Sequence, residues 1–94
     1  MKSFEDLLDK EYGRPGSKRR SDFEFQSLLF QIGTMIKDAR KDAGLTQEDL
    51  AERLHTKKSY ISRLENGKCD IQLSTLYRVF EDGLGRKITI TADQ

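Results

Sequence analysis

The stretch GLTQEDLAERLHTKKSYISRLENGK, residues 44–68, contains two short amphipathic patterns separated by the three-residue connection HTK. Thr46 and Asp49 have the spacing of a capping box, which predicts a helix over residues 46–54. Apolar residues at helical spacing predict a second helix over about residues 57–65. The inward side chains of these two helices are expected to be Leu50, Ala51, Leu54, Ile61 and Leu64.

A longer amphipathic helix is predicted before this stretch. It is expected to begin at Ser17 or at Ser21, and Ser21 is preferred because Glu24 would complete a capping box there. Gly44 is expected to end the helix, and Gly33 within it indicates close packing or a bend. Its apolar stripe consists of Phe25, Leu28, Leu29, Ile32, Met35, Ile36, Ala39 and Ala43.

Further helices are predicted on both sides of these elements. Ser3 and Asp6 have the spacing of a capping box, which predicts a short helix that ends near Gly13. Towards the other end of the chain, Ser74 is expected to cap a helix that ends at Gly83 and Gly85. The buried face of that helix is expected to consist of Leu76, Val79, Phe80 and Leu84.

One β-strand is predicted near the C-terminus. Isoleucine alternates with threonine over residues 87–91, and this period of two with β-branched side chains is typical of a strand. A single strand leaves its backbone groups unpaired within its own chain. We therefore expect the strand to pair with its copy in a second subunit, with Ile88 and Ile90 in the contact.

Size and composition indicate one small, soluble, helix-rich domain. The chain has 94 residues, of which 35% are hydrophobic and 35% are charged. No apolar run approaches the roughly 20 residues that span a bilayer, and the N-terminus lacks the apolar core of a secretory signal, so a cytoplasmic location is expected. One cysteine and one histidine cannot build a disulfide or a metal site. No catalytic constellation is present, and we expect neither an enzyme nor a cofactor.

Charge is distributed unevenly although the net charge is only +1. Residues 14–20 and 57–68 are basic, whereas residues 1–13 and 45–56 are acidic. Local basic patches, rather than the sum of charges, indicate contact with an anionic polymer. The alternative for the basic side chains is an ordinary solvated helix face.

Two short helices joined by a tight turn form a helix-turn-helix, and the small Ala51 allows the close approach that this motif needs. The combination of GLTQEDLAERL, SYISRLENGK and LSTL resembles the phage-repressor or Cro type of this motif, also called XRE or lambda-repressor-like. The resemblance covers residues 32–85. It implies an all-α bundle of about five to six helices that binds double-stranded DNA, and it favours DNA contact over the solvated-face alternative.

The resemblance also implies roles for individual residues. The second helix of the motif would be the recognition helix, which approaches base edges in the major groove. Arg63 is suited to guanine, and Lys58 would contact guanine with less directional preference. The implied base-contacting set is Lys58, Ser59, Ser62 and Arg63. The implied phosphate-contacting set is Gln47, Lys57, Tyr60, Asn66 and Lys68, and phosphate contacts set affinity without sequence preference.

The resemblance further implies a structural ion pair between Arg40 and Glu65, which would tie the long helix to the end of the recognition helix. Two positions depart from the family pattern. His55 stands where the family usually has glycine, so a positive φ is expected there. Lys57 stands where serine or threonine often caps the recognition helix, and Thr56 would be an alternative cap.

The residues before the motif resemble the N-terminal extension of HigA-type antitoxins, which bind a RelE-like (HigB-like) toxin and repress their own operon. This resemblance divides the chain into an extension over residues 1–30, a DNA-binding domain over 31–85 and a dimerisation strand over 86–94. It implies a homodimer on a palindromic operator, with Phe4–Phe30 covering the toxin. The alternatives are a stand-alone regulator and an interaction module that has lost DNA binding.

Overall fold

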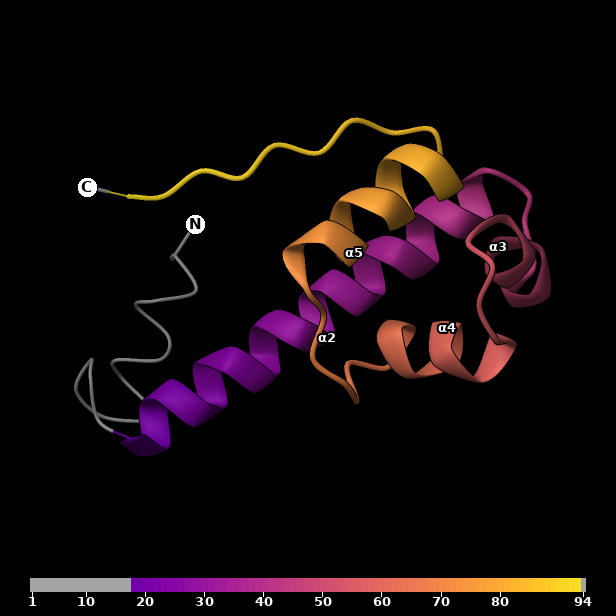
Figure 1. Cartoon of the computed structure of the whole chain (residues 1–94). Helices are drawn as coiled ribbons and strands as arrows, with labels where there is room; N and C mark the ends of the chain where they lie inside the picture. The colour runs from indigo at the N-terminus through magenta and orange to yellow at the C-terminus, as the bar shows by residue number, and fades with distance from the viewer. Residues whose placement is uncertain (1–17, 94) are drawn as a thin grey trace.

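The computed structural model describes residues 18–93, with their side chains from Ser21 onward, and the short helix expected near Ser3 lies outside this part. The described residues form helices and contain no strand, which confirms the all-α class. The total of five to six helices concerns the whole chain and stays a prediction. The elements, labelled as in Figure 1, are α2 (Lys18–Asp42), α3 (Gln47–Arg53), α4 (Lys58–Glu65), α5 (Leu73–Tyr77) and η1 (Arg78–Gly83), a π-helical segment that continues α5.

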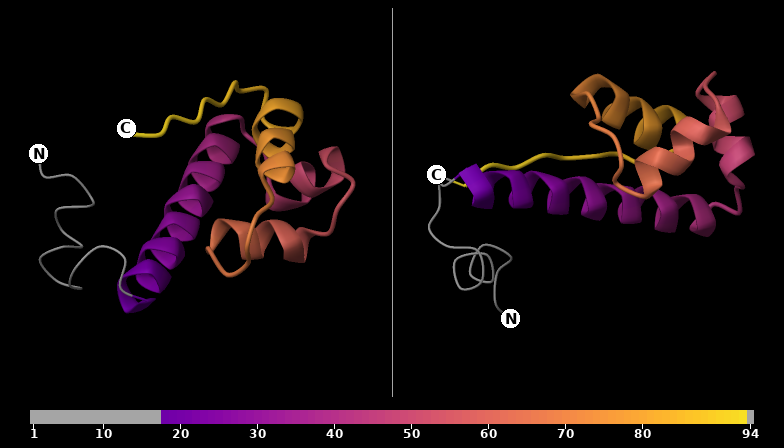
Figure 2. Two further views of the ribbon diagram at one scale, coloured as in Figure 1. Left: turned by 60° about the vertical axis from the view of Figure 1, so that its left-hand side comes forward. Right: turned by 90° about the horizontal axis from the view of Figure 1, so that it is seen from below.

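The helices after α2 pack around its C-terminal half, whereas its N-terminal half projects beyond them (Figures 1 and 2). The four largest fully buried side chains come from α2, α3, α4 and η1, one from each. They are Ile36, Leu50, Ile61 and Val79. Burying an aliphatic side chain of this size contributes about 1.5–3 kcal/mol, so the core holds all four elements together.

The backbones of α2 and α4 come into direct contact at the end of α4. A Cβ atom on Gly33 would lie 2.5 Å from the carbonyl oxygen of Glu65 and closer still to that of Leu64. A Cβ atom on Gly67 would lie 2.8 Å from the Cα of Phe30. Only glycine leaves room for this approach. Of the two expectations for Gly33, close packing is therefore the one observed.

Two predicted helix starts, Ser21 for α2 and Ser74 for α5, are wrong, and the alternative start of α2 at Ser17 lies outside the described residues. Helix α2 begins at Lys18, so Ser21 lies inside its first turns rather than at its cap. Lysine and arginine favour the helical conformation, which explains why the helix extends past Ser21. Helix α5 begins at Leu73 with Gln72 as its N-cap, so Ser74 does not cap it. The helix therefore begins two residues earlier than predicted, shortly after a contact in which Asp70 Oδ1 accepts from Ile71 N at 2.7 Å.

The C-terminal segment, residues 86–93, is extended but is not assigned as a strand within this single chain. The N–H of Arg86 donates to the carbonyl of Phe80 at 2.8 Å and ties the start of the segment to η1. From there the segment runs back alongside the projecting half of α2 (Figures 1 and 2). Its expected pairing with a second copy stays a prediction.

The contact at Gly33 yields a test of the fold. Gly33→Ala is expected to lower the free energy of unfolding by about 1–3 kcal/mol, because the new methyl group forces α2 and α4 apart. Urea denaturation measures the change, and Gln31→Ala on the exposed side of the same helix is the control. Helix propensity alone would instead make Gly33→Ala more stable by about 1 kcal/mol, and that result would refute the close approach.

Candidate nucleic-acid interface

Helix α3, the first helix of the motif, begins at the capping box that the sequence predicts. Thr46 Oγ1 accepts from Asp49 N at 3.0 Å, and Thr46 N donates to Asp49 Oδ2 at 2.9 Å. The backbone N–H of Thr46, followed by its hydroxyl, holds the pKa of the Asp49 carboxyl below its ordinary value. The negative charge also complements the positive end of the helix dipole. The capping box is thus confirmed, and it fixes where α3 starts.

Helices α2, α3 and α4 end with the same backbone geometry. The residues that close them have positive φ: Gly44 at 72°, His55 at 54° and Gly67 at 66°. The N–H of His55 donates to Glu52 O at 3.2 Å, and the next N–H donates to Ala51 O at 2.9 Å, which is a Schellman motif. The positive φ expected at His55 is confirmed. A non-glycine residue in this conformation costs about 1–2 kcal/mol, and here it closes the turn between α3 and α4.

Helix α4, the candidate recognition helix, begins without a side-chain cap. Its N-cap is Lys57, with φ −91° and ψ 148°, and no side chain accepts from the first N–H groups. The alternative cap at Thr56 is therefore wrong, because the turn closed by His55 places Thr56 one residue before the cap position. The uncapped N–H groups at the start of a helix are suited to binding an anion such as phosphate.

The outer face of α4 carries most of the expected base-contacting residues. Lys58, Ser59 and Arg63 are exposed, whereas Ser62 is half-buried. The guanidinium carbon of Arg63 lies 5.7 Å from the centre of the Tyr60 ring, in cation–π geometry. This contact holds an otherwise flexible arginine against the helix while its charge stays accessible. The outer face of α4 therefore carries an arginine that is in contact with a neighbouring aromatic ring.

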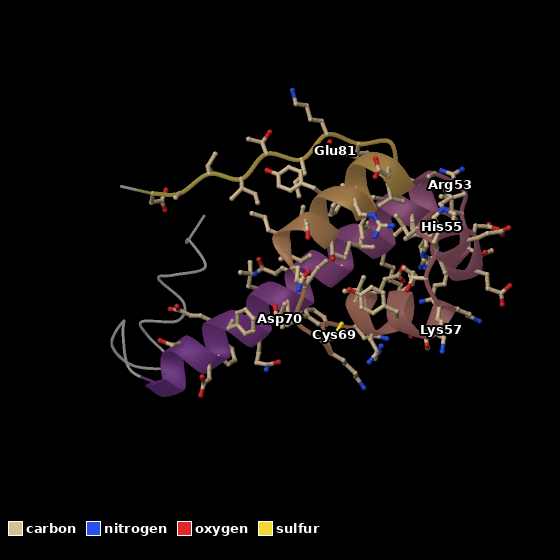
Figure 3. The ribbon with its side chains drawn as sticks, viewed as in Figure 1. Arg53, His55, Lys57, Cys69, Asp70 and Glu81 are labelled. Carbon is tan, nitrogen blue, oxygen red and sulfur yellow. The ribbon has the colours of Figure 1, made fainter. Side chains whose placement is uncertain are left out.

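The expected phosphate-contacting residues occupy different environments. Lys57 and Lys68 are exposed, and Lys57 lies at the start of α4 on the side of the molecule away from the C-terminal segment (Figure 3). Gln47 Nε2 donates to Glu65 Oε1 at 3.1 Å, so one of its amide hydrogens is already used. Asn66 Nδ2 donates to Ser62 O at 2.9 Å and closes the end of α4. Gln47 and Asn66 thus have structural partners, and the two lysines are free to meet phosphate.

Arg40 and Glu65 form the buried ion pair that joins α2 to the end of α4. Arg40 Nε donates to Glu65 Oε2 at 2.6 Å, and a second guanidinium nitrogen donates to Oε1 at 3.0 Å. A third bond, 2.8 Å long, runs from Arg40 to the carbonyl of Leu45. Hydrogen bonding to Glu65 raises the pKa of Arg40. No buried side-chain nitrogen or oxygen among the described residues lacks a partner, so this pair meets the condition for stable burial.

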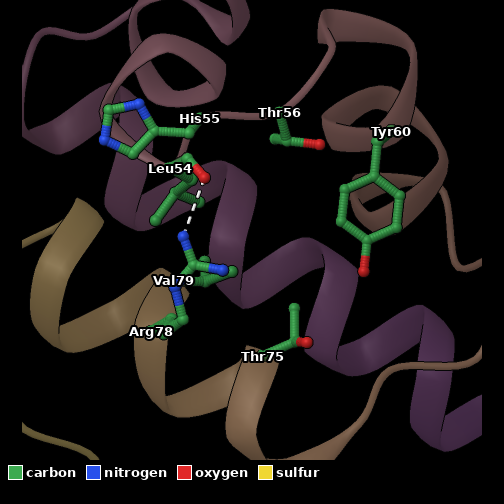
Figure 4. Close-up of a pocket in the computed structure, with 7 residues that line it drawn as sticks. All are labelled: Leu54, His55, Thr56, Tyr60, Thr75, Arg78 and Val79. Carbon is green, nitrogen blue, oxygen red and sulfur yellow. Dashed lines mark hydrogen bonds between the residues drawn. The ribbon is translucent and has the colours of Figure 1, made fainter.

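Sequence reasoning missed three residues at this site. Glu48 Oε1 lies 3.8 Å from Lys58 Nζ, across the turn, and both side chains are exposed. Arg78 donates to the carbonyl of Leu54 at 2.8 Å beside a pocket of about 170 Å³ that Tyr60 also lines (Figure 4). Arg53 donates to the carbonyl of Gly83 at 3.0 Å. All three interactions join residues from different elements, and no local spacing in the sequence signals them.

A short helix with an exposed basic face, held on a helical bundle by a tight turn, defines a helix-turn-helix DNA-binding domain. A helix-turn-helix family model matches residues 36–81. An uncharacterized HTH-type transcriptional regulator of Methanothermobacter thermautotrophicus is 41% identical over 54 residues, which span 57% of this chain and 77% of that protein. The chain belongs to the helix-turn-helix family of transcriptional regulators.

A second relative comes from a phage. The ImmF control region 10 kDa protein of Bacillus phage phi105 is 37% identical over 49 residues, which cover 52% of this chain and 54% of that protein. The chain thus matches about half the length of this relative. Within residues 18–93, no helix is long and apolar enough to cross a membrane. No group of three or more metal-ligating side chains gathers in the same part.

The strained turn at His55 yields a test. His55→Gly is expected to raise the free energy of unfolding by roughly 0.5–1 kcal/mol, because the relief of about 1–2 kcal/mol of strain exceeds the added chain entropy of glycine. Urea denaturation measures the change. His55→Ala keeps the strain and serves as the control. A glycine variant that is less stable than the alanine variant by roughly 0.5–1 kcal/mol, the chain-entropy cost of glycine, would show that this φ carries no strain.

Proposed function

We propose that the protein is a sequence-specific DNA-binding repressor that inserts α4 into the major groove. The observation that carries this proposal is the division of α4 into two faces. Ile61 and Leu64 are buried in the core, and Glu65 is held by Arg40. The remaining surface of α4 presents the exposed side chains Lys58 and Arg63, with Arg63 held over the Tyr60 ring. A rigid helix with a basic outer face is what major-groove recognition requires.

The proposed contacts divide into two sets with different consequences. Lys58, Ser59, Ser62 and Arg63 contact base edges, and Arg63 binds guanine O6 and N7 through its two parallel N–H groups. Phosphates are contacted by Gln47, Lys57, Tyr60, Asn66 and Lys68, together with the uncapped N-terminus of α4. Glu48 lies beside Lys58 and reduces attraction of this face to DNA of any sequence.

The repressor is proposed to act as a homodimer on a palindromic operator. Two copies related by a two-fold axis present their α4 helices about 34 Å apart to successive major grooves. The dimer is joined in part by the C-terminal segments, through Ile88 and Ile90. Two relatives of this chain carry transcriptional-regulator or control-region names, which supports a regulatory role.

We further propose that the protein is an antitoxin whose N-terminal extension, Phe4–Phe30, covers a RelE-like toxin. Helix α2 continues 18 residues before the start of the family match at residue 36. This added part carries Phe30, whose side chain is 62% exposed. Apolar side chains of this size on a surface indicate a protein partner.

The DNA-binding proposal is tested by comparing two substitutions. Arg63→Ala is expected to reduce discrimination at one or two operator positions by about 1–3 kcal/mol, because a bidentate base contact is lost. Lys68→Ala is expected to weaken binding to all duplexes alike and to lower the salt dependence by about one phosphate contact. Fluorescence anisotropy on the protein's own promoter and on point-mutated duplexes, over a range of salt, measures both effects.

Wild-type protein on an unrelated duplex provides the baseline for these measurements. Unchanged operator preference in Arg63→Ala would show that Arg63 does not contact bases. Failure of the wild-type protein to bind its promoter even at low salt would instead indicate an interaction module that has lost DNA binding.

The antitoxin proposal is tested separately by co-expression with the product of the adjacent gene. The expected result is a stable complex that co-purifies. Co-expression should also relieve any growth arrest that the neighbouring protein causes alone. The affinity of the protein for its promoter should change when the two proteins are together. Arg63→Ala is the matched control, because it should still bind the neighbour while losing operator preference. Absence of a complex would identify a stand-alone regulator.

A further inference from the structure

An apolar groove of about 450 Å³ lies on the side of the molecule away from α4. Its walls come from the projecting half of α2, from the start of α5 and from the C-terminal segment. Phe25 and Leu28 line it from α2, Leu73 lines it from α5, and Ile88 and Ile90 line it from the C-terminal segment. On the sequence alone, the first part of α2 is assigned to a toxin partner and the C-terminal segment to dimerisation. In the structure, both elements line the same groove.

The rim of the groove is too apolar for a surface that stays in water. Phe25 is 46% exposed, Leu28 is 49% exposed, and Leu73 and Ile90 are 59% and 53% exposed. The floor is formed by side chains that already belong to the core, including Leu76 and Phe80. A contiguous apolar surface of this kind marks a site that another polypeptide covers.

Within the described residues, the C-terminal segment has an unpaired backbone edge to which another polypeptide can bind. No residue in the range 18–93 pairs with residues 87–93 in a strand or bridge, so within this range their backbone N–H and C=O groups form an open edge. Ile88 and Ile90 stand two residues apart and both line the groove. Antiparallel pairing of two such segments around Thr89 sets Ile88 of each copy opposite Ile90 of the other. The segment is thus complementary to itself.

We infer that a second copy of this chain covers the groove, so that Phe25, Leu28 and Leu73 receive the isoleucines of the second copy's C-terminal segment. This inference rests on the proposed homodimer and deepens it by adding the seat on α2 and α5. A two-fold contact of this kind uses the same surface on both copies. It also leaves both α4 helices uncovered, because the C-terminal segment that lines the groove and α4 lie on opposite sides of α2 (Figure 1).

The inference divides α2 between two partners. Phe25 and Leu28 belong to the dimer contact. Phe30 is 62% exposed but does not line the groove, so it remains available to a different protein. A toxin bound by the N-terminal extension would then meet the Phe30 side of α2 and not the groove.

The test compares two glutamate substitutions on the same helix by sedimentation equilibrium. The wild-type chain is expected to sediment as a dimer of twice 10.9 kDa. Leu28→Glu is expected to raise the dimer dissociation constant at least about tenfold, because it places a charge in an apolar contact. Phe30→Glu, the matched control, is expected to leave it unchanged. Circular dichroism of each variant shows that the fold is retained.

A second variant tests the backbone pairing. Thr89→Pro removes an N–H group from the paired edge and lies outside the helical core, and it is expected to weaken the dimer without lowering helix content. A monomeric wild-type chain, or a Leu28→Glu variant that dimerises as tightly as wild type, would overturn the inference. Loss of binding to the adjacent gene product in Leu28→Glu with an intact dimer would also overturn it, because the groove would then belong to that partner.

DNA binding separates this inference from the proposed function. Monomeric Leu28→Glu should bind a palindromic site more weakly while keeping its base preference on a half-site. If the wild-type protein dimerises through the groove but binds no DNA, the dimer inference stands and the repressor proposal fails. If the wild-type protein binds its promoter while Leu28→Glu remains a full dimer, the repressor proposal stands and the dimer inference fails.

Discussion

The position of α4, the candidate recognition helix, depends on the direct contact between the backbones of α2 and α4. Gly33 on α2 and Gly67 after α4 leave no side chain between the two elements, and any larger residue at Gly33 would displace the end of α4. The ion pair of Arg40 and Glu65 spans the same junction, with Glu65 only 2% exposed at its side chain. A buried pair is stable when all of its hydrogen-bonding groups are used, and Glu65 accepts from both Arg40 and Gln47. The close backbone contact at Gly33 and the hydrogen-bonded carboxylate of Glu65 therefore both hold α4 against α2.

This junction explains why the exposed residues of α4 are organised although α4 has only eight residues. An isolated helix of that length is not stable in water. Here its inner face is buried, its end is closed by a Schellman motif after Glu65, and its arginine rests on Tyr60. The motif accepts strain at His55 to make the turn that places α4 against α3. The burial of Ile61 and Leu64 therefore determines which way the outer face of α4, including Arg63, points.

The sequence was sufficient for features set by local patterns. The capping box at Thr46 and the buried set of α3 and α4 follow from spacing and residue type, and the structure confirms them. The positive φ at His55 was expected from the family resemblance and is also confirmed. The preferred start of α2 at Ser21 and the start of α5 at Ser74 were misplaced, because serine is only one of several signals for a cap. The contacts of Glu48, Arg53 and Arg78 could not be predicted, since each joins residues that only the tertiary fold brings together. Within the predicted apolar stripe of α2, Leu29, Ile36 and Ala39 are buried, Phe25 and Leu28 are exposed, and Ala43 lies beyond the end of the helix. Hydrophobic periodicity alone does not distinguish the part of a stripe that faces the core from the part that faces a groove.

Helix α2 is the one element that belongs to both sides of the molecule. Its C-terminal half holds α4 through Gly33 and Arg40, and its N-terminal half forms a wall of the apolar groove. It runs without interruption from Lys18 to Asp42, across the position at which the extension was divided from the DNA-binding domain. A rigid helix transmits orientation along its length, so whatever covers the groove sets the direction in which α4 faces. With a second copy in the groove, the separation of the two α4 helices would be fixed by α2, and half-site spacing on the operator would follow from how two α2 helices cross. A partner that acts on the Phe30 side of α2 would then alter DNA binding by changing that crossing, without touching α4.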